Sequence, residues 1–236
     1  MNSKYKRVLL KLSGQSLKGN LESGIDYQVL LSYTSQIKEV VEMGVEVGIV
    51  IGGGNIFRGQ SGSDLGFDRV KGDYMGMFAT MINGLALQSG FENIGQTAHL
   101  FTAFNTEPAG ERYSQAKAIH ALNNKHIAII TGGTGNPYFS TDSASALRAL
   151  EIKADIILKG TRVDGVYTSD PEKNPDAKKI KQISYEEIIE KELKVMDLTA
   201  FTLCRENKIP LYVFDMDTPG NLKKVLLGEE IGTMIS

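Results

Sequence analysis

The sequence predicts an α/β protein, built around a mainly parallel sheet with helices on both faces. Three observations indicate this class. Unbroken runs of Val, Ile and Leu, such as IAIIT at 127–131, alternate with segments of helical periodicity, and such strands are typical of parallel sheets buried on both sides. Glycine clusters follow several of these runs directly. The 236 residues are 42% hydrophobic and 23% charged, which is ordinary for a globular protein and excludes a disordered chain.

Two strand-and-helix units are expected in the first part of the chain. RVLLK at 7–11 reads as a buried strand that a glycine turn closes at Gly14. VEVGIVI at 45–51 is the next strand, and Gly52, Gly53 and Gly54 follow it at once. A glycine-dotted loop then leads to a Met- and Leu-rich helix from about Asp73 to Ser89. Between the strands, residues 28–43 are predicted as a helix ending at Gly44, because apolar residues recur at helical spacing at Val29, Tyr33, Ile37, Val40 and Val41.

The alternation continues to the end of the chain. Strands are predicted at 97–101, 127–131, 155–159 and 211–214, and helices at 114–124, from about Thr141, at 185–190 and at 198–207. The strand at 127–131 breaks at Gly132, Gly133 and Gly135. For the final helix we expect Thr218 as N-cap, Pro219 at the first helical position and Gly228 just past the end, the usual placement of these residue types.

The organisation favours a single domain. No Pro/Ser-rich linker, block of like charge, low-complexity segment or internal repeat divides the chain, so one domain over residues 1–236 is expected. A separate lobe at 161–196 is the alternative. The segment 168–181, which holds two of the six prolines, is predicted to be a surface excursion.

Charge and composition exclude several classes of protein. The 26 basic and 28 acidic residues leave a formal charge of -2, so no overall positive field draws the chain to nucleic acid or anionic lipid. No run approaches the roughly 20 apolar residues of a membrane helix, and the start lacks the apolar core of a signal peptide, so we expect a cytoplasmic protein. The three histidines have no zinc-site spacing, and the one cysteine, Cys204, is expected to be buried filler.

Four predicted strand ends carry residue types that suit a phosphate site. They are Lys11 to Gly14, the run 52–55, the run 132–137, and Lys159 to Thr161. In a parallel sheet, ligands bind beyond the carboxyl ends of the strands, and glycine lets backbone N–H groups approach an anion. Each feature alone has a plainer interpretation, since a glycine loop is often a tight turn and a strand-end lysine is often a solvated cap. Two glycine loops together with two lysines favour phosphate binding.

The common phosphate motifs are absent, and the charged residues near the loops leave alternatives open. Neither loop completes GxxxxGK[ST] or GxGxxG, which argues against P-loop and Rossmann enzymes. Asp73 and Asp142 fit either the site or a helix terminus, and Asp170, before a proline, fits a turn. Asp164 also follows the Lys159 strand. Arg58 is either a solvated charge or a phosphate clamp, and the glycines of its loop favour the clamp.

Six ordered strings carry a family resemblance. They are KLSG at 11–14, IGGGNIFRG at 51–59, GDYMGMFAT at 72–80, GTGNPYFSTDSAS at 133–145, LKGTRVDGVYTSDP at 158–171 and KELKVMDLTAF at 191–201. From about Tyr5 to Ile235 the chain resembles the bacterial uridylate (UMP) kinases of the amino acid kinase family. The lysine and glycine framework alone also fits glutamate, aspartate or carbamate kinases of that fold, whereas GDYMGM and TGNPYFSTD point to the nucleotide kinases. The implied fold is a three-layer αβα sandwich.

The resemblance implies roles for the matched residues. Those implied to contact ATP are Lys11, Leu12, Ser13, Gly14 and Gly54, with Arg58 nearby, and Thr161, Tyr167 and Asp170 at the nucleoside. Those implied to hold UMP are Gly53, Asp73, Thr134, Gly135, Asn136, Pro137, Tyr138, Phe139, Ser140 and Thr141. Lys11 and Lys159 would flank the transferring phosphoryl group, with Asp142 orienting the lysines and Arg58 assisting.

The implied activity is transfer of the ATP γ-phosphoryl group to UMP in pyrimidine nucleotide biosynthesis. Mg²⁺ would accompany ATP, with no protein residue implied as a metal ligand, and the assembly would be a homohexamer activated by GTP and inhibited by UTP. Family members commonly read KLSGE, whereas this chain has Gln15, which removes a carboxylate beside the phosphate loop. Two rival functions are a kinase of a small carboxylate or carbamate, and a non-catalytic sensor of uridine nucleotides.

Overall fold

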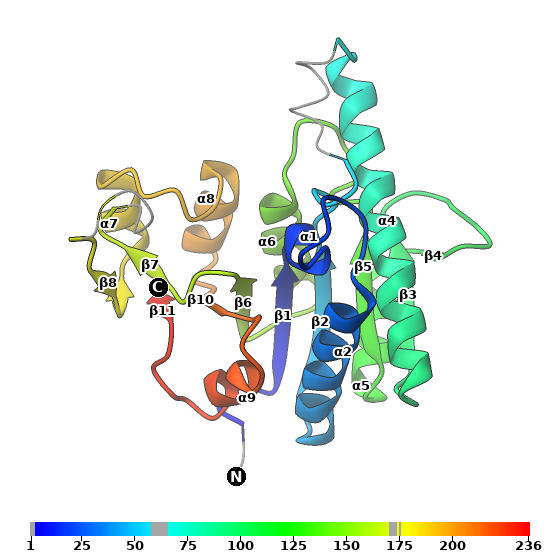
Figure 1. Ribbon diagram of the computed structural model, residues 1–236, viewed down its shortest axis with the longest axis horizontal. Coiled ribbons are helices and arrows are strands. Elements are labelled where there is room, and N and C mark those ends of the chain that lie inside the picture. Colours follow the sequence, from blue (N-terminus) through cyan, green and yellow to red (C-terminus); the bar gives the residue numbers. More distant parts are fainter. Residues whose placement is uncertain (1–2, 58–65, 170–173, 175) are drawn as a thin grey trace.

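The fold is built around a central sheet. The computed structural model describes residues 3–57, 66–169, 174 and 176–236. In this part of the chain one sheet has nine strands in the order β4-β3-β5-β2-β1-β6-β10-β11-β9, and every neighbouring pair is parallel except β10 with β11. The strands are β1 (Arg7–Leu12), β2 (Glu46–Ile51), β3 (Ala98–Thr102), β4 (Glu111–Arg112), β5 (Ile127–Thr131), β6 (Ile156–Thr161), β9 (Gln182–Ile183), β10 (Leu211–Asp215) and β11 (Thr233–Ile235). The predicted α/β class is confirmed, and β1 lies in the middle of the sheet between β2 and β6 (Figure 1).

Helices cover both faces of the sheet. Side chains alternate along a strand, so Leu10 of β1 joins one core and Leu9 joins the other. The first core takes residues from α2 (Tyr27–Glu42), α4 (Arg69–Asn93) and α9 (Asn221–Leu226). The second takes residues from α5 (Gln115–Asn123), α6 (Thr141–Glu151), α7 (Tyr185–Glu190) and α8 (Leu198–Glu206). The three layers that the resemblance implied are therefore present.

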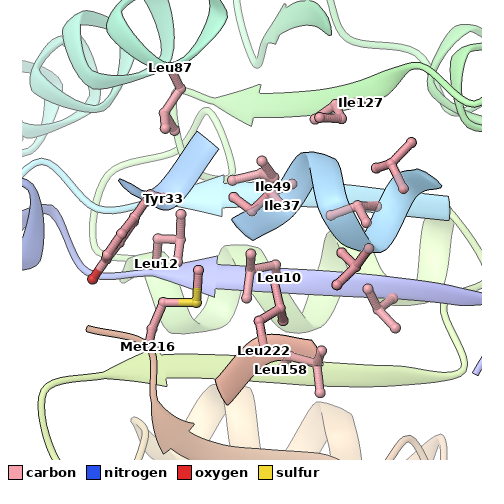
Figure 2. Packing of buried hydrophobic residues seen from close by; sticks show 14 of the residues in the cluster. Leu10, Leu12, Tyr33, Ile37, Ile49, Leu87, Ile127, Leu158, Met216 and Leu222 are labelled. Carbon is pink, nitrogen blue, oxygen red and sulfur yellow. The ribbon is translucent and has the colours of Figure 1, made fainter. Parts of the chain in front are cut away.

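The packing of α2 shows how sequence pattern becomes buried surface. Asp26 caps the helix by accepting hydrogen bonds from the backbone N–H groups of Gln28 and Val29. Its apolar stripe then lies on the sheet, and Figure 2 shows Tyr33 and Ile37 beside strand residues such as Leu10. Ile37 is fully buried, and burial of such a side chain stabilises the fold by about 1.5–3 kcal/mol.

Two helix starts differ from the sequence prediction. Helix α4 begins at Arg69, with Asp68 as N-cap, so Asp73 lies a full turn inside the helix and the helix-terminus interpretation of Asp73 is wrong. The final helix begins at Asn221 after Gly220, not at Pro219. Thr218 does not cap this helix, because Gly220 is its N-cap and no side chain accepts from the first turn; the Thr218 hydroxyl donates to the Asp215 carboxylate. Gly228 does follow the helix end with φ of 91°, as predicted.

Several short elements escaped the sequence analysis. Gly14 opens a short helix, α1 (Gly14–Leu17), instead of a turn. Strands β4, β9 and β11 have two or three residues each, and β7 (Val166–Tyr167) pairs with β8 (Lys179–Ile180) in a separate small sheet. Strand β7 thus ends just before the predicted excursion 168–181, and β8 lies within it. Among the described residues, no helix has both the length and the apolar character needed to cross a membrane.

Candidate active site

Two lysines lie side by side at the carboxyl ends of neighbouring strands. Lys11 of β1 and Lys159 of β6 are partners in the parallel register, so their side chains leave the same face of the sheet. Leu9 and Ile157, two residues earlier in each strand, pack in the core that α6 covers. Both ammonium groups therefore reach the first turn of α6. Only 12% of the Lys11 side chain and 11% of the Lys159 side chain is exposed.

Asp142 joins the two lysines. Lys11 Nζ lies 2.9 Å from Asp142 Oδ1, and Lys159 Nζ lies 2.9 Å from Oδ2. Ser140 caps α6 by accepting from the N–H groups of Asp142 and Ser143, which fixes where the carboxylate stands. Asp142 thus lies in the first turn of α6 and also contacts both lysines. Its helix-terminus interpretation and its site interpretation are therefore compatible.

Burial and neighbouring charges shift the pKa values of Asp142 and Lys159. Burial raises the pKa of Asp142, but the charges of Lys11 and Lys159 outweigh burial and hold that pKa below its usual range. Burial lowers the pKa of Lys159, the neighbouring Lys11 charge lowers it further, and Asp142 opposes both effects. Asp142 is therefore a carboxylate at neutral pH. Lys159 also donates to the Val195 carbonyl.

A cleft of about 630 Å³ opens beside the cluster. Its walls come from the end of β1, the end of β2, helix α4, the loop before α6 and the start of α8. The predicted site residues that line it are Lys11, Ser13, Gly14, Gly53, Gly54, Asp73, Tyr138, Phe139, Ser140, Thr141 and Asp142. Lys159 does not line the cleft and adjoins it through Asp142. The volume lies within the range of small-molecule sites.

Gly14, after β1, and Gly53, after β2, lie where the backbone packs closely against its neighbours. A Cβ on Gly14 would collide with the Gly52 carbonyl, and a Cβ on Gly53 would lie 2.7 Å from Ala79 Cβ in α4. The Gln15 amide donates to the Gly54 carbonyl, so α1 and the glycine run after β2 are tied together. The glycines let these two segments pack against each other and also line the cleft, where a backbone without side chains suits an anion.

Comparison with known proteins identifies the family. The sequence profile described as the amino acid kinase family matches residues 6–215. The chain belongs to the amino acid kinase family. The uridylate kinase of Bacteroides thetaiotaomicron is 60% identical over 233 residues, 99% of each chain, and that of Parabacteroides distasonis is 59% identical over the same share of each. The UMP kinase structure from Bacillus anthracis superimposes with a TM-score of 0.95 at 38% identity, covering 98% of this chain and 96% of that one.

An ion pair of helix α4 also lines the cleft of this amino acid kinase. Asp73 accepts from Arg69 Nε through both carboxylate oxygens, each at 2.9 Å, and Asp73 Oδ2 also accepts from the backbone N–H of Tyr138 at 2.8 Å. Arg69 lines the cleft but was missed by the sequence analysis. The misplaced start of α4 hid the four-residue spacing of Arg69 and Asp73, which is the signal that pairs them.

Asp197 is a further residue that the sequence analysis missed. It caps α8 by accepting from Ala200 N–H, and it also accepts from the hydroxyls of Ser140 and Ser143 at the start of α6. It therefore connects α8 to the turn that carries Asp142. A clue was available, because Asp197 directly precedes the apolar helical run in KELKVMDLTAF.

Several predicted site residues of this amino acid kinase do not line the cleft. They are Leu12, Thr161 and Tyr167 on the ATP side and Thr134, Gly135, Asn136 and Pro137 on the UMP side. Leu12 is fully buried, and its carbonyl accepts from the Gly52 N–H. Thr161 donates to the Val163 carbonyl and Tyr167 donates to Asp164. Arg58 and Asp170 lie outside the described residues.

Proposed function

We propose that this chain transfers the γ-phosphoryl group of ATP to UMP, giving ADP and UDP. One observation carries the proposal: Lys11 and Lys159, from strands far apart in the sequence, share Asp142 beside a glycine-lined cleft. Five uridylate kinases, 53–60% identical to this chain over at least 98% of its length, support the same substrates. We also propose that the chain is one domain, because the central sheet takes strands from both of its ends.

The mechanism needs charge and position more than proton transfer. A UMP phosphate oxygen attacks the γ-phosphorus, a P–O bond forms, and the bond to the β,γ-bridging oxygen breaks with its electrons leaving on ADP. A phosphate monoester has its second pKa near 6, so the nucleophile is already largely dianionic and no protein base is required. Lys11 and Lys159 stabilise the negative charge on the transferring group, and Asp142 keeps the two ammonium groups together.

The two nucleotides occupy opposite sides of the cleft in this proposal. ATP phosphates lie on 11–14 and Gly54, and the nucleoside extends toward Thr161 and Tyr167. The resemblance also implies ATP contacts for Arg58 and Asp170, which lie outside the described residues. UMP lies against Gly53, Asp73 and the run 134–141. Among the described residues, no group of three or more His, Cys, Asp or Glu is placed to hold a metal ion. We assign Mg²⁺ to the ATP phosphates and water, because this is the coordination that the ion favours in nucleotide sites.

Self-association is part of the same proposal. Four large apolar side chains of α4 recur at helical spacing and are 40–51% exposed, namely Tyr74, Phe78, Ile82 and Leu85. A stripe of this kind supports contact with another copy, in the homohexamer that the resemblance implies. Ile82→Glu should yield a smaller species in sedimentation, and an unchanged mass would contradict the contact. GTP activation and UTP inhibition are tested by adding each nucleotide to the assay below.

A coupled assay of ADP release tests the function. UMP, CMP and glutamate are offered as acceptors with ATP and Mg²⁺, and we expect the highest kcat/KM with UMP. Transfer to glutamate, aspartate or carbamate with none to UMP would select the rival kinase activity. Binding of UMP and UTP without ADP release would select the sensor, the reading that Gln15 favours.

A further inference from the structure

Arg69 and Tyr138 form a structural unit around Asp73. Arg69 lies in the first turn of α4 and donates from Nε to both oxygens of Asp73, four residues later in the helix. Only 13% of the Asp73 side chain is exposed, against 37% for Arg69. Asp73 is therefore the more buried member of the pair, and both residues line the cleft.

Tyr138 reaches the same carboxylate from the loop before α6. Its backbone N–H donates to Asp73 Oδ2 at 2.8 Å, and its φ of 70° lies in the left-handed region, which costs a non-glycine residue roughly 1–2 kcal/mol. The guanidinium carbon of Arg69 lies 5.2 Å from the centre of the Tyr138 ring. A cation over an aromatic face is attracted to it, so Arg69 offsets part of the backbone cost by holding both the carboxylate and the ring.

We propose that Arg69 is a positioning residue for the acceptor nucleotide. Its Nε fixes the Asp73 carboxylate and its guanidinium plane supports Tyr138, so that α4 and the loop before α6 keep one geometry across the cleft. A carboxylate offers about four acceptor positions, and the bonds from Arg69 and from Tyr138 N–H leave room for a hydroxyl of the acceptor. This inference rests on the proposed function, because it assumes that the acceptor binds on the Asp73 side.

The geometry explains why arginine is required. A guanidinium is planar, so it pairs with a carboxylate through one edge while a face stacks on a ring. A lysine in its place would keep the charge, but its ammonium group is a single point charge. It could not lie against the Asp73 carboxylate and over the Tyr138 ring at the same time. Substitution by lysine, which keeps the charge, and by glutamine, which removes it, can therefore separate the effect of the charge of Arg69 from the effect of its shape.

Steady-state kinetics of ADP release tests the role. For Arg69→Gln we expect KM for UMP to rise about tenfold, with KM for ATP and kcat within about twofold of the parent. Arg69→Lys should recover less than half of that loss, and Tyr138→Ala should raise KM for UMP as well. In the double variant Arg69→Gln/Tyr138→Ala the effects should not multiply, because both substitutions disrupt one unit.

A matched control is Lys191→Gln, which removes another four-residue-spaced ion pair, with Glu187 in α7, remote from the cleft lining. Its KM values should match the parent. Equal increases in KM for UMP and ATP with Arg69→Gln, full recovery with Arg69→Lys, or fully multiplying effects in the double variant would overturn the positioning role. If the parent itself forms no ADP with UMP, the proposed function fails first. If the parent turns over and Arg69→Gln keeps a normal KM for UMP, only the inference fails.

Discussion

Removing the carboxylate between the two lysines is the most direct test of the site. In Asp142→Asn the side chain keeps its size, but Lys11 and Lys159 lose the anion that each approaches at 2.9 Å. At an effective dielectric constant of about 20, each pair carries roughly 6 kcal/mol of Coulomb attraction, most of it offset by desolvation. Breaking a buried pair by removing one partner costs about 3–5 kcal/mol. We expect the free energy of unfolding to fall by that amount at neutral pH.

The pH dependence of this loss has a defined sign. The pKa of Asp142 is depressed in the folded state, so its contribution is complete above the unfolded pKa and disappears as pH falls through the folded pKa. The parent and Asp142→Asn should therefore converge in strongly acidic solution. The pKa of Lys159 is also depressed, and loss of Asp142 lowers it further. A lysine of this kind destabilises the fold while protonated, so the variant should regain stability relative to the parent as pH rises from neutral toward alkaline values.

Urea unfolding followed by far-UV circular dichroism measures these differences. The matched control is Glu39→Gln, which removes the partner of Lys223 from an ion pair whose side chains are 42–45% exposed. Exposed pairs contribute about 0–1 kcal/mol, so the control should unfold almost as the parent does. An Asp142→Asn variant that loses less than about 1 kcal/mol at neutral pH, or whose deficit does not change with pH, would refute the assigned electrostatics.

Three further predictions address the catalytic groups, the loops and the thiol. Lys11→Ala and Lys159→Ala should each lower kcat at least about a hundredfold while the protein stays folded, and near-normal turnover in either would refute its assignment. Gly53→Ala should lower the free energy of unfolding by about 1–3 kcal/mol because its Cβ would crowd α4, whereas Gly76→Ala, with nothing within 4 Å of the new Cβ, should leave it equal or raise it. Burial raises the pKa of Cys204 to about 12, so a thiol reagent at mildly alkaline pH should label it only after denaturant is added, and labelling of the folded protein would contradict its burial.

The sequence predicted those parts of the site that depend on local pattern. Lys11 and Lys159 each end an apolar run, and the glycines that follow β2 and β5 are visible without any structure. The strand register could not be predicted in this way, because the pairing of Lys11 with Lys159 depends on which strands become neighbours in the sheet. Strands β1 and β2 follow each other in the sequence, so their pairing is easy to expect. Nothing in the sequence indicates that β6 pairs with the other edge of β1. The shared use of Asp142 could therefore be expected only through the family resemblance.

The errors have local physical causes. The start of α4 was placed too late because Gly72 and the charged residues around it lack an apolar stripe, whereas the cap at Asp68 decides the start. Thr218 looked like an N-cap, but the helix begins three residues later, after Gly220. Strand β11 has three residues, too few for a periodicity to be recognised. Asp197 accepts from side chains at the start of α6 that are distant in sequence. The sequence around Asp197 therefore indicates its role as the N-cap of α8 but not its hydrogen bonds to α6.

The central place of β1 has a consequence for synthesis on the ribosome. Its partner on one side, β2, follows soon after it, but the partner on the other side, β6, emerges only after about 150 further residues, on the order of ten seconds at typical translation rates. During that interval one edge of an apolar strand has no neighbour to cover it, and unpaired edges invite association with other chains. Early chaperone contact with the nascent amino-terminal half, released once residue 161 has left the exit tunnel, would therefore protect this protein.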